Sequence, residues 1–261
     1  MNLVIDIGNT QIFLGIFEKD DLKLTFRKSS KNEFSSDEFG VFINNVFNIN
    51  CIDIKKIKNV CISSVVPSFN YTIRNSIKKY IGVEPIFVEQ GTKTGINIKY
   101  KNPSELGADR IANCIGANLL YGNKNFIIID MGTATTFDIL TEKKEYLGGI
   151  IIPGPELQIN SLATNTAKLP SVEFKKSNFE IDSTVKAIQS GIYFMNYYTI
   201  KGITEKIKKE IFKNNPVTIV ATGGFSRIYE DTDLFDVINY DLILYGLNEI
   251  IKRRSNDDWN A

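Results

Sequence analysis

The hydrophobic pattern of the chain predicts two similar halves, each built on strands that lead into a polar turn. In each half an apolar run ends at an aspartate, Asp6 in the first half and Asp130 in the second. Short apolar or alternating runs bounded by Gly, Pro, Asn or Asp are typical of strands. They predict strands at residues 2–17 (two strands around a turn), 22–29, 58–66, 85–89, 125–131, 134–141, 145–152 and 217–221.

Helical spacing of apolar residues fills most of the remaining sequence. In a helix expected after Pro103, the residues Ile111, Ile115 and Leu119 recur at i, i+4 and i+8 and predict its buried face. The alternation of strands with helices favours an α/β fold, with mixed sheets flanked by helices. The expected helices cover residues 35–48, 67–81, 103–120, 155–164, 182–212 and 241–253.

The length and the repeat indicate two domains. A chain of 261 residues is long enough for two modest domains. We expect the first at 1–115 and the second at 116–254, followed by a frayed tail at 255–261. No linker is rich in Pro or Ser, so the helix at 103–120 is expected to join the halves. A Gly-, Thr- and Lys-rich connection without regular structure is expected at 91–100.

The two aspartate turns are copies of one motif. Residues 6–10 (Asp-Ile-Gly-Asn-Thr) and 130–134 (Asp-Met-Gly-Thr-Ala) are separated by 130 − 6 = 124 residues, close to half of the chain. Glycine lets the backbone approach an anion, turn N–H groups bind it, and threonine adds a hydroxyl donor. An aspartate at a strand end can hold a metal ion or its water ligands. Either motif alone also fits an ordinary hairpin, but the repetition favours polyphosphate binding in a cleft shared by two domains.

Composition and charge exclude several classes of protein. Lys+Arg 31 against Asp+Glu 30 leaves a net charge of +1, which does not favour a nucleic acid or an anionic membrane as partner. Three lysines within residues 206–209 are flanked by Glu205 and Glu210 and indicate a solvated helix face. No apolar run approaches the roughly 20 residues of a membrane span, and the first residues lack a signal peptide's basic region. Cys51, Cys61 and Cys114 are widely spaced, which indicates free or buried thiols and a cytoplasmic location.

The absence of histidine narrows the possible chemistry. It excludes a Ser-His-Asp triad, a histidine zinc site and a histidine general base. A carboxylate is therefore the leading candidate for proton abstraction, ahead of Lys or Tyr. Residues 91–95 (Gly-Thr-Lys-Thr-Gly) look like a P-loop fragment, but the required spacing is absent, and no Gly-x-Gly-x-x-Gly fingerprint occurs.

Two further elements have candidate roles. Residues 107–110 (Gly-Ala-Asp-Arg) lie in the first turns of an expected helix, where the helix dipole favours an ionised carboxylate. Asp109 could accept a proton from a substrate hydroxyl and Arg110 could bind a phosphate or carboxylate, although a solvent-facing Asp–Arg pair fits the same spacing. Residues 222–224 (Thr-Gly-Gly) suit either the close approach of an adenosine or a simple strand-to-helix turn. The aromatic residues within 193–198 favour a core or a subunit interface over a ligand site.

The complete set of motifs resembles the type III pantothenate kinases, bacterial enzymes of the acetate kinase/sugar kinase/Hsp70/actin superfamily. The Gly-Ala-Asp-Arg and Gly-Gly-x-x-x-Pro-Gly elements narrow the match to this family, whereas the two aspartate turns are shared across the superfamily. The resemblance implies two ribonuclease H-like domains of the actin-like ATPase type with a cleft between them. The matching segments occur in family order and span nearly the whole chain: 6–10, 107–110, 130–136, 148–154 and 222–224.

The resemblance also implies an activity and its parts. The activity is ATP-dependent phosphorylation of pantothenate to 4'-phosphopantothenate, the first step towards coenzyme A, with Mg²⁺ and a monovalent cation, K⁺ or NH₄⁺. Asp109 resembles the general base, Asp130 a ligand of the monovalent cation, and Asp6 would hold Mg²⁺ through waters. The residues that resemble the ATP site are Asp6, Ile7, Gly8, Asn9, Thr10, Gln11, Ile12, Phe13 and Thr133. Those that resemble the pantothenate pocket are Tyr100, Gly107, Ala108, Asp109, Arg110 and Thr184, the last supplied across a homodimer interface.

Two other functions fit part of the pattern. A different kinase or phosphatase of the superfamily, acting on sugars, acetate or polyphosphate, would share the aspartate turns and lack only the narrower motifs. A non-catalytic regulator is the second, because some proteins of this family were first described as transcriptional accessory factors. No helix-turn-helix segment or basic stripe in the sequence favours the regulator.

Overall fold

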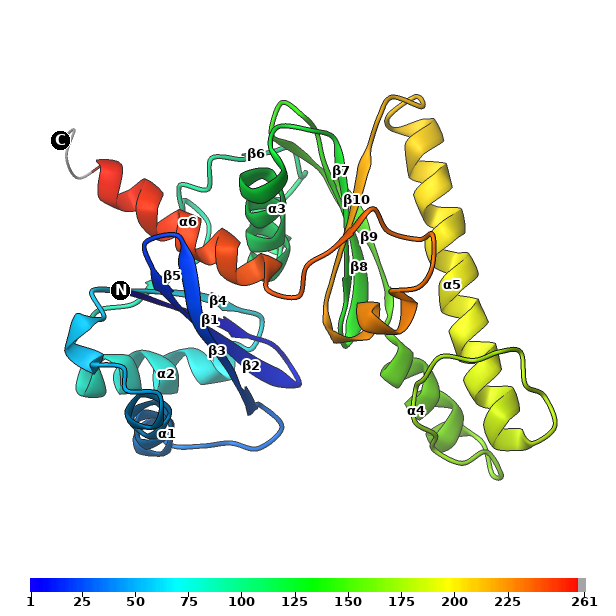
Figure 1. Cartoon of the computed structure of the whole chain (residues 1–261), viewed down its shortest axis with the longest axis horizontal. Helices are drawn as coiled ribbons and strands as arrows, with labels where there is room; N and C mark the ends of the chain where they lie inside the picture. Colours follow the sequence, from blue (N-terminus) through cyan, green and yellow to red (C-terminus); the bar gives the residue numbers. More distant parts are fainter. Residues whose placement is uncertain (258–261) are drawn as a thin grey trace. The chain divides into compact units, whose positions relative to one another are not determined.

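The computed structural model describes residues 1–257, and the chain divides into two compact units (Figure 1). Unit 1 comprises residues 1–96 and 100–120 together with the last helix, which begins after Asp241. Unit 2 comprises residues 97–99 and 121–240. This division differs from the expected boundary at 115/116 in three ways. Residues 116–120 belong to unit 1. The last helix groups with the first sheet, and the short segment at 97–99 groups with the second.

Unit 1 is built on a five-stranded sheet in the order β3-β2-β1-β4-β5. β1 is antiparallel to β2 and parallel to β4. Leu3, Ile5 and Ile7 alternate along β1 and point into a core formed with two helices, α1 and α2. Figure 1 shows these helices on one face of the sheet and α6 on the other. The bounds are β1 (Asn2–Ile7), β2 (Gln11–Glu18), β3 (Asp21–Ser29), α1 (Ser36–Ile49), β4 (Asn59–Ser64), α2 (Pro67–Tyr80), β5 (Ile86–Phe87) and α6 (Leu242–Asp257).

Local signals account for the helices of unit 1. A capping box starts α1: the Glu38 N–H donates to Ser35 Oγ at 3.2 Å and the Ser35 N–H donates to Glu38 Oε2 at 2.7 Å. Pro67 occupies the first turn of α2, where a missing N–H costs nothing. The predicted strands and helices of this half are confirmed to within a few residues at each end.

Helix α3 (Ala108–Tyr121) is packed against α6 through two glycines. A Cβ on Gly116 would lie 2.3 Å from the Leu242 carbonyl oxygen, and one on Gly246 would lie 1.9 Å from the Ala112 carbonyl oxygen. The backbones of the two helices are therefore in direct contact. Ile111 and Ile115 are buried as expected, whereas the prediction for Leu119 was wrong, because it lies in the exposed last turn.

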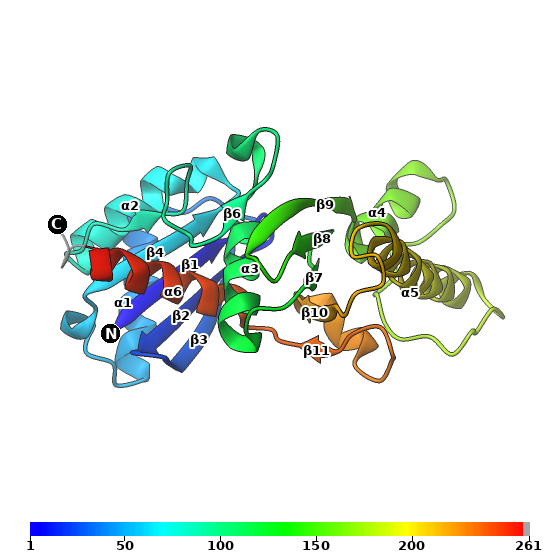
Figure 2. The same cartoon turned by 90° about the horizontal axis from the view of Figure 1, so that it is seen from above.

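Unit 2 is built on a six-stranded sheet in the order β11-β10-β7-β8-β9-β6. Ile127, Ile129, Phe137 and Ile139 form its core together with the long helix α5. Figures 1 and 2 show α5 along one face of this sheet. The bounds are β6 (Asn97–Ile98), β7 (Phe126–Met131), β8 (Ala134–Leu140), β9 (Glu145–Pro153), α4 (Pro155–Asn165), α5 (Thr184–Glu210), β10 (Thr218–Thr222) and β11 (Val237–Ile238).

Several expected elements are corrected by the structure. Pro103–Glu105 forms a separate 3₁₀ turn, and extended backbone at Leu106 separates it from α3, so the helix does not begin at Pro103. Two short strands, β6 and β11, carried too little pattern to be predicted. Helix α6 continues to Asp257, so residues 255–257 are not a tail, and residues 258–261 lie outside the described part of the chain.

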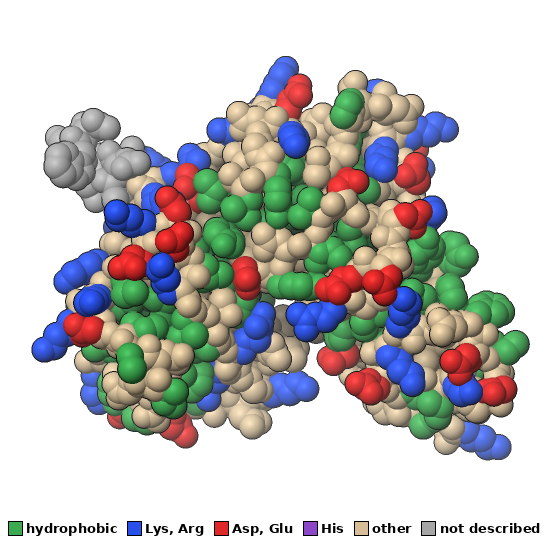
Figure 3. All heavy atoms as spheres, viewed as in Figure 1, with side chains coloured by type: hydrophobic (Ala, Val, Ile, Leu, Met, Phe, Trp, Pro, Cys, Tyr) green, Lys and Arg blue, Asp and Glu red, His purple; other side chains and the backbone are tan. Residues whose placement is uncertain are grey.

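The surface agrees with the composition. Basic and acidic side chains are interspersed on the face drawn in Figure 3. The lysines near the end of α5 pair with glutamates, Lys206 with Glu210 at 2.8 Å and Lys208 with Glu205 at 3.2 Å, which confirms a solvated helix face. Of the helices that the structure describes, none combines the length and the apolar character that a membrane crossing needs. Cys61 and Cys114 are buried thiols and Cys51 is an exposed one.

Candidate active site

The first aspartate turn is a tight hairpin between β1 and β2 in unit 1. The Gly8 N–H donates to the Gln11 carbonyl oxygen at 3.0 Å, and a Cβ on Gly8 would lie 3.1 Å from that oxygen. Ser30, at the end of β3, fixes the turn from outside: its hydroxyl donates to the Gly8 carbonyl at 2.7 Å and its N–H to the Thr10 carbonyl at 3.1 Å. The turn is therefore a rigid, preformed structure, which suits the binding of an anion by backbone N–H groups.

Residues 6–13 are predicted to contact ATP, but only some of these eight residues have side chains that a ligand can reach. Asn9 and Gln11 are exposed, whereas Ile7 and Ile12 belong to the hydrophobic core. Ile7 and Ile12 therefore offer backbone groups only. Phe13 is buried beneath Arg27, whose guanidinium carbon lies 3.6 Å from the ring centroid.

Asp6 lies on the face of the sheet opposite the α1 and α2 core. Its register partners are Phe13 on β2 and Ser63 on β4, so these residues share a row with Arg27, the partner of Phe13 on β3. The Ser63 hydroxyl is fully buried and makes no hydrogen bond within the described part of the chain. Sequence reasoning missed both Ser63 and Arg27, because no motif includes them. Only strand register places Ser63 next to Asp6 and Arg27 in the same row beyond Phe13.

The Gly-Ala-Asp-Arg segment forms the start of α3. Asp109 Oδ1 accepts a hydrogen bond from the Arg110 N–H at 2.8 Å, and a Cβ on Gly107 would lie 2.3 Å from the same oxygen. Glycine is therefore needed for this carboxylate position. Arg110 is only 6% exposed, which excludes the solvent-facing Asp–Arg pair that the spacing also allowed. Tyr100, a half-buried residue between β6 and the 3₁₀ turn, precedes this segment.

The protonation of Asp109 is set by opposing effects. Burial raises the pKa of its carboxyl above the ordinary value, while the Arg110 N–H and guanidinium lower the pKa. A carboxylate with a raised pKa is a stronger base than an exposed one, and the contacts with Arg110 oppose that rise. These are the properties that a general base requires.

Three motifs meet at the second aspartate turn, in unit 2. A Cβ on Gly223 would lie 2.4 Å from Asp130 Oδ1, which brings the Thr-Gly-Gly turn against the aspartate. The Gly154 N–H donates to the Thr133 carbonyl oxygen at 2.9 Å, and a Cβ on Gly154 would lie 2.2 Å from the Gly132 carbonyl oxygen. The turn at 130–134 therefore contacts both Gly154, at the end of the 148–154 segment, and the turn at 222–224, which lies about 90 residues further along the chain.

Asp130 is flanked by hydroxyl groups on the neighbouring strands. Its register partners are Thr136 on β8 and Thr222 on β10. Residues 127, 129 and 131 point to the α5 core, so Asp130 and its two threonine partners lie on the opposite face. A carboxylate with hydroxyl oxygens on both neighbouring strands is a suitable set of donors for a hard cation such as K⁺ or Mg²⁺. Over residues 1–257, Cys, Asp and Glu side chains do not gather in threes around a possible metal position.

Thr184 is distant in sequence from these turns. It is the first residue of α5. Ser183 caps this helix, its hydroxyl accepting the Lys186 N–H at 3.3 Å. Thr184 is exposed, and exposed apolar side chains from the same unit include Phe179 at 68% and Tyr198 at 64%. Tyr193, by contrast, is a core residue, so the aromatic group within 193–198 is divided between core and surface.

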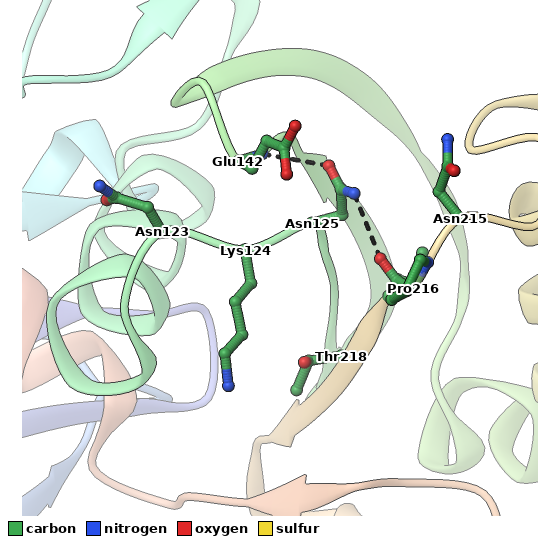
Figure 4. A pocket seen from close by; sticks show the side chains of 8 residues that line it. Asn123, Lys124, Asn125, Glu142, Asn215, Pro216 and Thr218 are labelled. Atoms are coloured by element: carbon green, nitrogen blue, oxygen red, sulfur yellow. Dashed lines mark hydrogen bonds between the residues drawn. The ribbon is translucent and has the colours of Figure 1, made fainter.

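A pocket of about 460 Å³ opens at the other edge of the second sheet, at the amino ends of β7 and β10 (Figure 4). Asn125 spans it: its amide donates to the Pro216 carbonyl at 3.2 Å and its side-chain oxygen accepts the Glu142 N–H at 3.1 Å. The asparagine fixes the start of two strands to a neighbouring turn. None of the motif residues lines this pocket. Asp6, Asp130 and Thr222 lie instead at the carboxyl ends of β1, β7 and β10.

The fold defines the general class of the protein. It is similar to the solved structure of the activator of 2-hydroxyisocaproyl-CoA dehydratase from Clostridium difficile with bound ADPNP. The TM-score is 0.54 at 11% identity, and the match covers 100% of this chain and 97% of that chain. At this identity the likeness concerns the fold alone, which is that of the actin-like ATPases and sugar kinases. The predicted fold class is confirmed.

The sequence defines the family within that class. The family model of the type III pantothenate kinases matches residues 2–206, and the chain belongs to this family. The type III pantothenate kinase of Legionella pneumophila (strain Corby) is 44% identical over 248 residues, which cover 95% of this chain and 96% of that protein. The one from Elusimicrobium minutum is 45% identical over the same shares. Membership confirms the predicted kinase class and disfavours the non-catalytic regulator and the sugar or acetate kinase.

Proposed function

We propose that this chain phosphorylates pantothenate from ATP, with Asp109 as the general base. In the proposed step Asp109 accepts the proton of the primary hydroxyl of pantothenate. The hydroxyl oxygen bonds to the γ-phosphorus while the bond from that phosphorus to the β–γ bridging oxygen breaks, and ADP leaves. The observation that supports this role is the Asp109 carboxylate itself: burial raises its pKa, and a helix start and Arg110 orient it.

The remaining site residues are assigned to binding and charge neutralisation. The hairpin at Asp6–Phe13 is proposed to contact the phosphates of ATP through backbone N–H groups, and Thr133 to add a second contact. Asp6 would hold Mg²⁺ through waters, and Asp130 would ligate K⁺ or NH₄⁺. A bound monovalent cation supplies positive charge in a site that lacks a P-loop lysine. The threonine residues opposite Asp130 on both neighbouring strands are compatible with this ion, because their hydroxyl groups offer oxygen lone pairs.

An assay of ADP release tests the substrate and the cation together. With ATP, Mg²⁺ and purified protein, we expect release that depends on pantothenate and falls sharply when K⁺ is replaced by Na⁺ at equal ionic strength. ADP release that ignores pantothenate would indicate another acceptor or simple hydrolysis. Equal rates in both salts would contradict the assignment of a monovalent cation to Asp130 and would leave the assignment of pantothenate as substrate unaffected.

We also propose a homodimer, in which Thr184 contacts pantothenate bound to the other chain, and a cytoplasmic location. The exposed apolar residues of unit 2 support an interface, because a second copy that packs on them would remove their side chains from water. They include Ile151 on β9, Leu157 on α4 and Met195 and Tyr198 on α5. Sedimentation as a monomer at micromolar concentration would contradict the dimer.

Complementation between two inactive variants tests the shared site directly. Asp109→Asn and Thr184→Val should each be impaired. After unfolding and refolding together, random pairing should restore about a quarter of wild-type activity, since half of the dimers then carry one intact site. Each variant refolded alone is the control. Recovery that does not exceed the sum of the two controls would place Thr184 and Asp109 in the same chain's site.

A further inference from the structure

A buried acid lies beside the proposed cation site, and the proposed function does not use it. Asp138, on β8, is fully buried. The Tyr146 hydroxyl donates to Asp138 Oδ1 at 2.8 Å, and the Thr136 hydroxyl donates to Asp138 Oδ2 at 3.2 Å. A buried carboxylate is expensive to remove from water unless hydrogen bonds satisfy it. The two hydroxyl groups satisfy Asp138 in this way and link its carboxylate to Thr136, the register partner of Asp130.

Strand alternation places Asp138 and Thr136 on the same face as Asp130. Phe137 and Ile139 belong to the core beneath α5, so the residues between and before them point to the other face. Thr136 is the register partner of Asp130, and Asp138 is the partner of Ile128, two residues earlier on β7. Thr136 and Asp138 therefore lie side by side on one face of the sheet. Thr136 is opposite Asp130, and Asp138 is two residues further along β8.

A β-bulge brings Tyr146 to this face. Between β8 and β9 the register passes from Ile139–Gly148 to Leu140–Tyr146, so Leu147 has no partner. In regular pairing Tyr146 would point to the α5 side, because one residue of register reverses the face of a strand. Gly148 has φ +127°, a conformation open to glycine. The Gly-Gly pair of the 148–154 motif thus allows the bulge that delivers a hydroxyl donor to Asp138.

The hydrogen-bond directions have a chemical consequence for Thr136. A threonine hydroxyl carries one hydrogen and two lone pairs. Since the hydrogen is donated to Asp138, the lone pairs remain for other partners. The hydroxyl stands next to Asp130, where oxygen lone pairs favour a cation and disfavour another hydrogen-bond acceptor.

We propose that Asp138 is a positioning residue that makes Thr136 a lone-pair donor beside Asp130, with Tyr146 fixing Asp138 in turn. The role deepens the proposed function and rests on the monovalent cation at Asp130. Neither Asp138 nor Tyr146 touches the substrates in this proposal; both act through Thr136. The cation class that fits is a weakly hydrated monovalent ion bound by carboxylate and hydroxyl oxygens.

The test compares Asp138→Asn and Tyr146→Phe with the wild-type protein in a KCl series, with NaCl maintaining the ionic strength. Two quantities are measured: the melting temperature and the K⁺ concentration for half-maximal turnover. We expect both midpoints to move to roughly 10–100-fold higher K⁺ in Asp138→Asn, as for other residues that orient metal ligands, and to a smaller extent in Tyr146→Phe. Tyr229→Phe is the matched control, because it removes another buried hydroxyl, which donates to the Tyr193 carbonyl at 3.0 Å on the α5 side.

The outcomes separate this inference from the cation site itself. If Asp138→Asn and Tyr146→Phe melt lower but keep the wild-type K⁺ midpoint, as expected of Tyr229→Phe, the residues are only structural and the inference is overturned. If K⁺ affects neither the melting nor the turnover of the wild type, the cation site fails and the inference fails with it. Should Asp138→Asn not fold, Thr136→Val must raise the K⁺ midpoint while Thr136→Ser preserves it; equal midpoints would contradict the proposal.

Discussion

Asp109→Asn is expected to lower turnover by roughly 10²–10⁴-fold, the usual contribution of a general base. The amide has nearly the same volume as the carboxylate, and its oxygen can still accept the Arg110 N–H. ATP binding, measured by equilibrium titration, should therefore be unchanged. Wild-type turnover in this variant would remove Asp109 from the base role. A loss of ATP binding would instead indicate a structural effect.

The same substitution has a predicted effect on stability with a defined sign. Burial raises the pKa of Asp109 in the folded protein above its ordinary value of 3.8. A raised folded-state pKa means that the stabilising contribution is present below the ordinary value and is lost as the pH rises through the folded value. Once the pH exceeds the folded-state pKa, the ionised Asp109 is therefore a net cost, which asparagine removes.

Thermal melts at a series of pH values measure this effect. Asp109→Asn should melt at or above the wild-type temperature at pH 7, and the difference should shrink as the pH falls towards 3.8. The wild-type kcat/KM should also decline on the acid side at a pH above the ordinary value of an aspartate. A variant that melts well below the wild type at pH 7 would show that Asp109 stabilises the fold and is not maintained there for catalysis.

Gly223→Ala is expected to have the second large effect, on the stability of unit 2 and on the Asp130 site. Gly223 has φ +81°, and a Cβ there would lie 2.4 Å from Asp130 Oδ1 and 2.6 Å from the Met131 backbone. Backbone strain of this kind costs about 1–3 kcal/mol, and the contact must displace the Asp130 carboxylate. We expect a lower melting temperature and a weakened stabilisation by K⁺.

The adjacent glycine is the matched control for stability. A Cβ on Gly224 would meet no heavy atom within 4 Å, and the chemical change is the same. Gly224→Ala should therefore melt close to the wild-type temperature. If both variants are equally destabilised, the effect comes from the flexibility of the turn. If neither is, the backbone at Gly223 rearranges freely and Asp130 does not depend on it.

Local patterns determined most of the secondary structure and the family. Amphipathic spacing, caps and prolines act within a few residues, so the long elements of both halves could be predicted to within a few residues. The motifs that identify the family are likewise contiguous: the aspartate turns, Gly-Ala-Asp-Arg and Gly-Gly-x-x-x-Pro-Gly. These motifs can be recognised without the fold, because each is defined by residue types at a fixed short spacing.

The tertiary structure decided the assignments that depend on distant parts of the chain. Helix α6 follows the second sheet in sequence but packs with the first, and the two-residue strand β6 adds to the second sheet by pairing with β9. The burial of Arg110 and the exposure of Leu119 depend on which neighbours cover α3. Boundaries and burial of this kind follow from packing between elements, which periodicity along one element does not reveal.

The sequence by itself determined the family and the two aspartate turns, because these follow from residue types at short spacing. It also predicted a carboxylate as the base, because the chain contains no histidine. Only the tertiary structure showed that Asp130 has threonine neighbours, that Ser63 is aligned with Asp6, and that a bulge turns Tyr146 towards Asp138. Strand register and a one-residue bulge decide which side chains share a face. These features are set by pairing between separate strands, so a polar residue outside a motif acquires its partners only when the sheet forms.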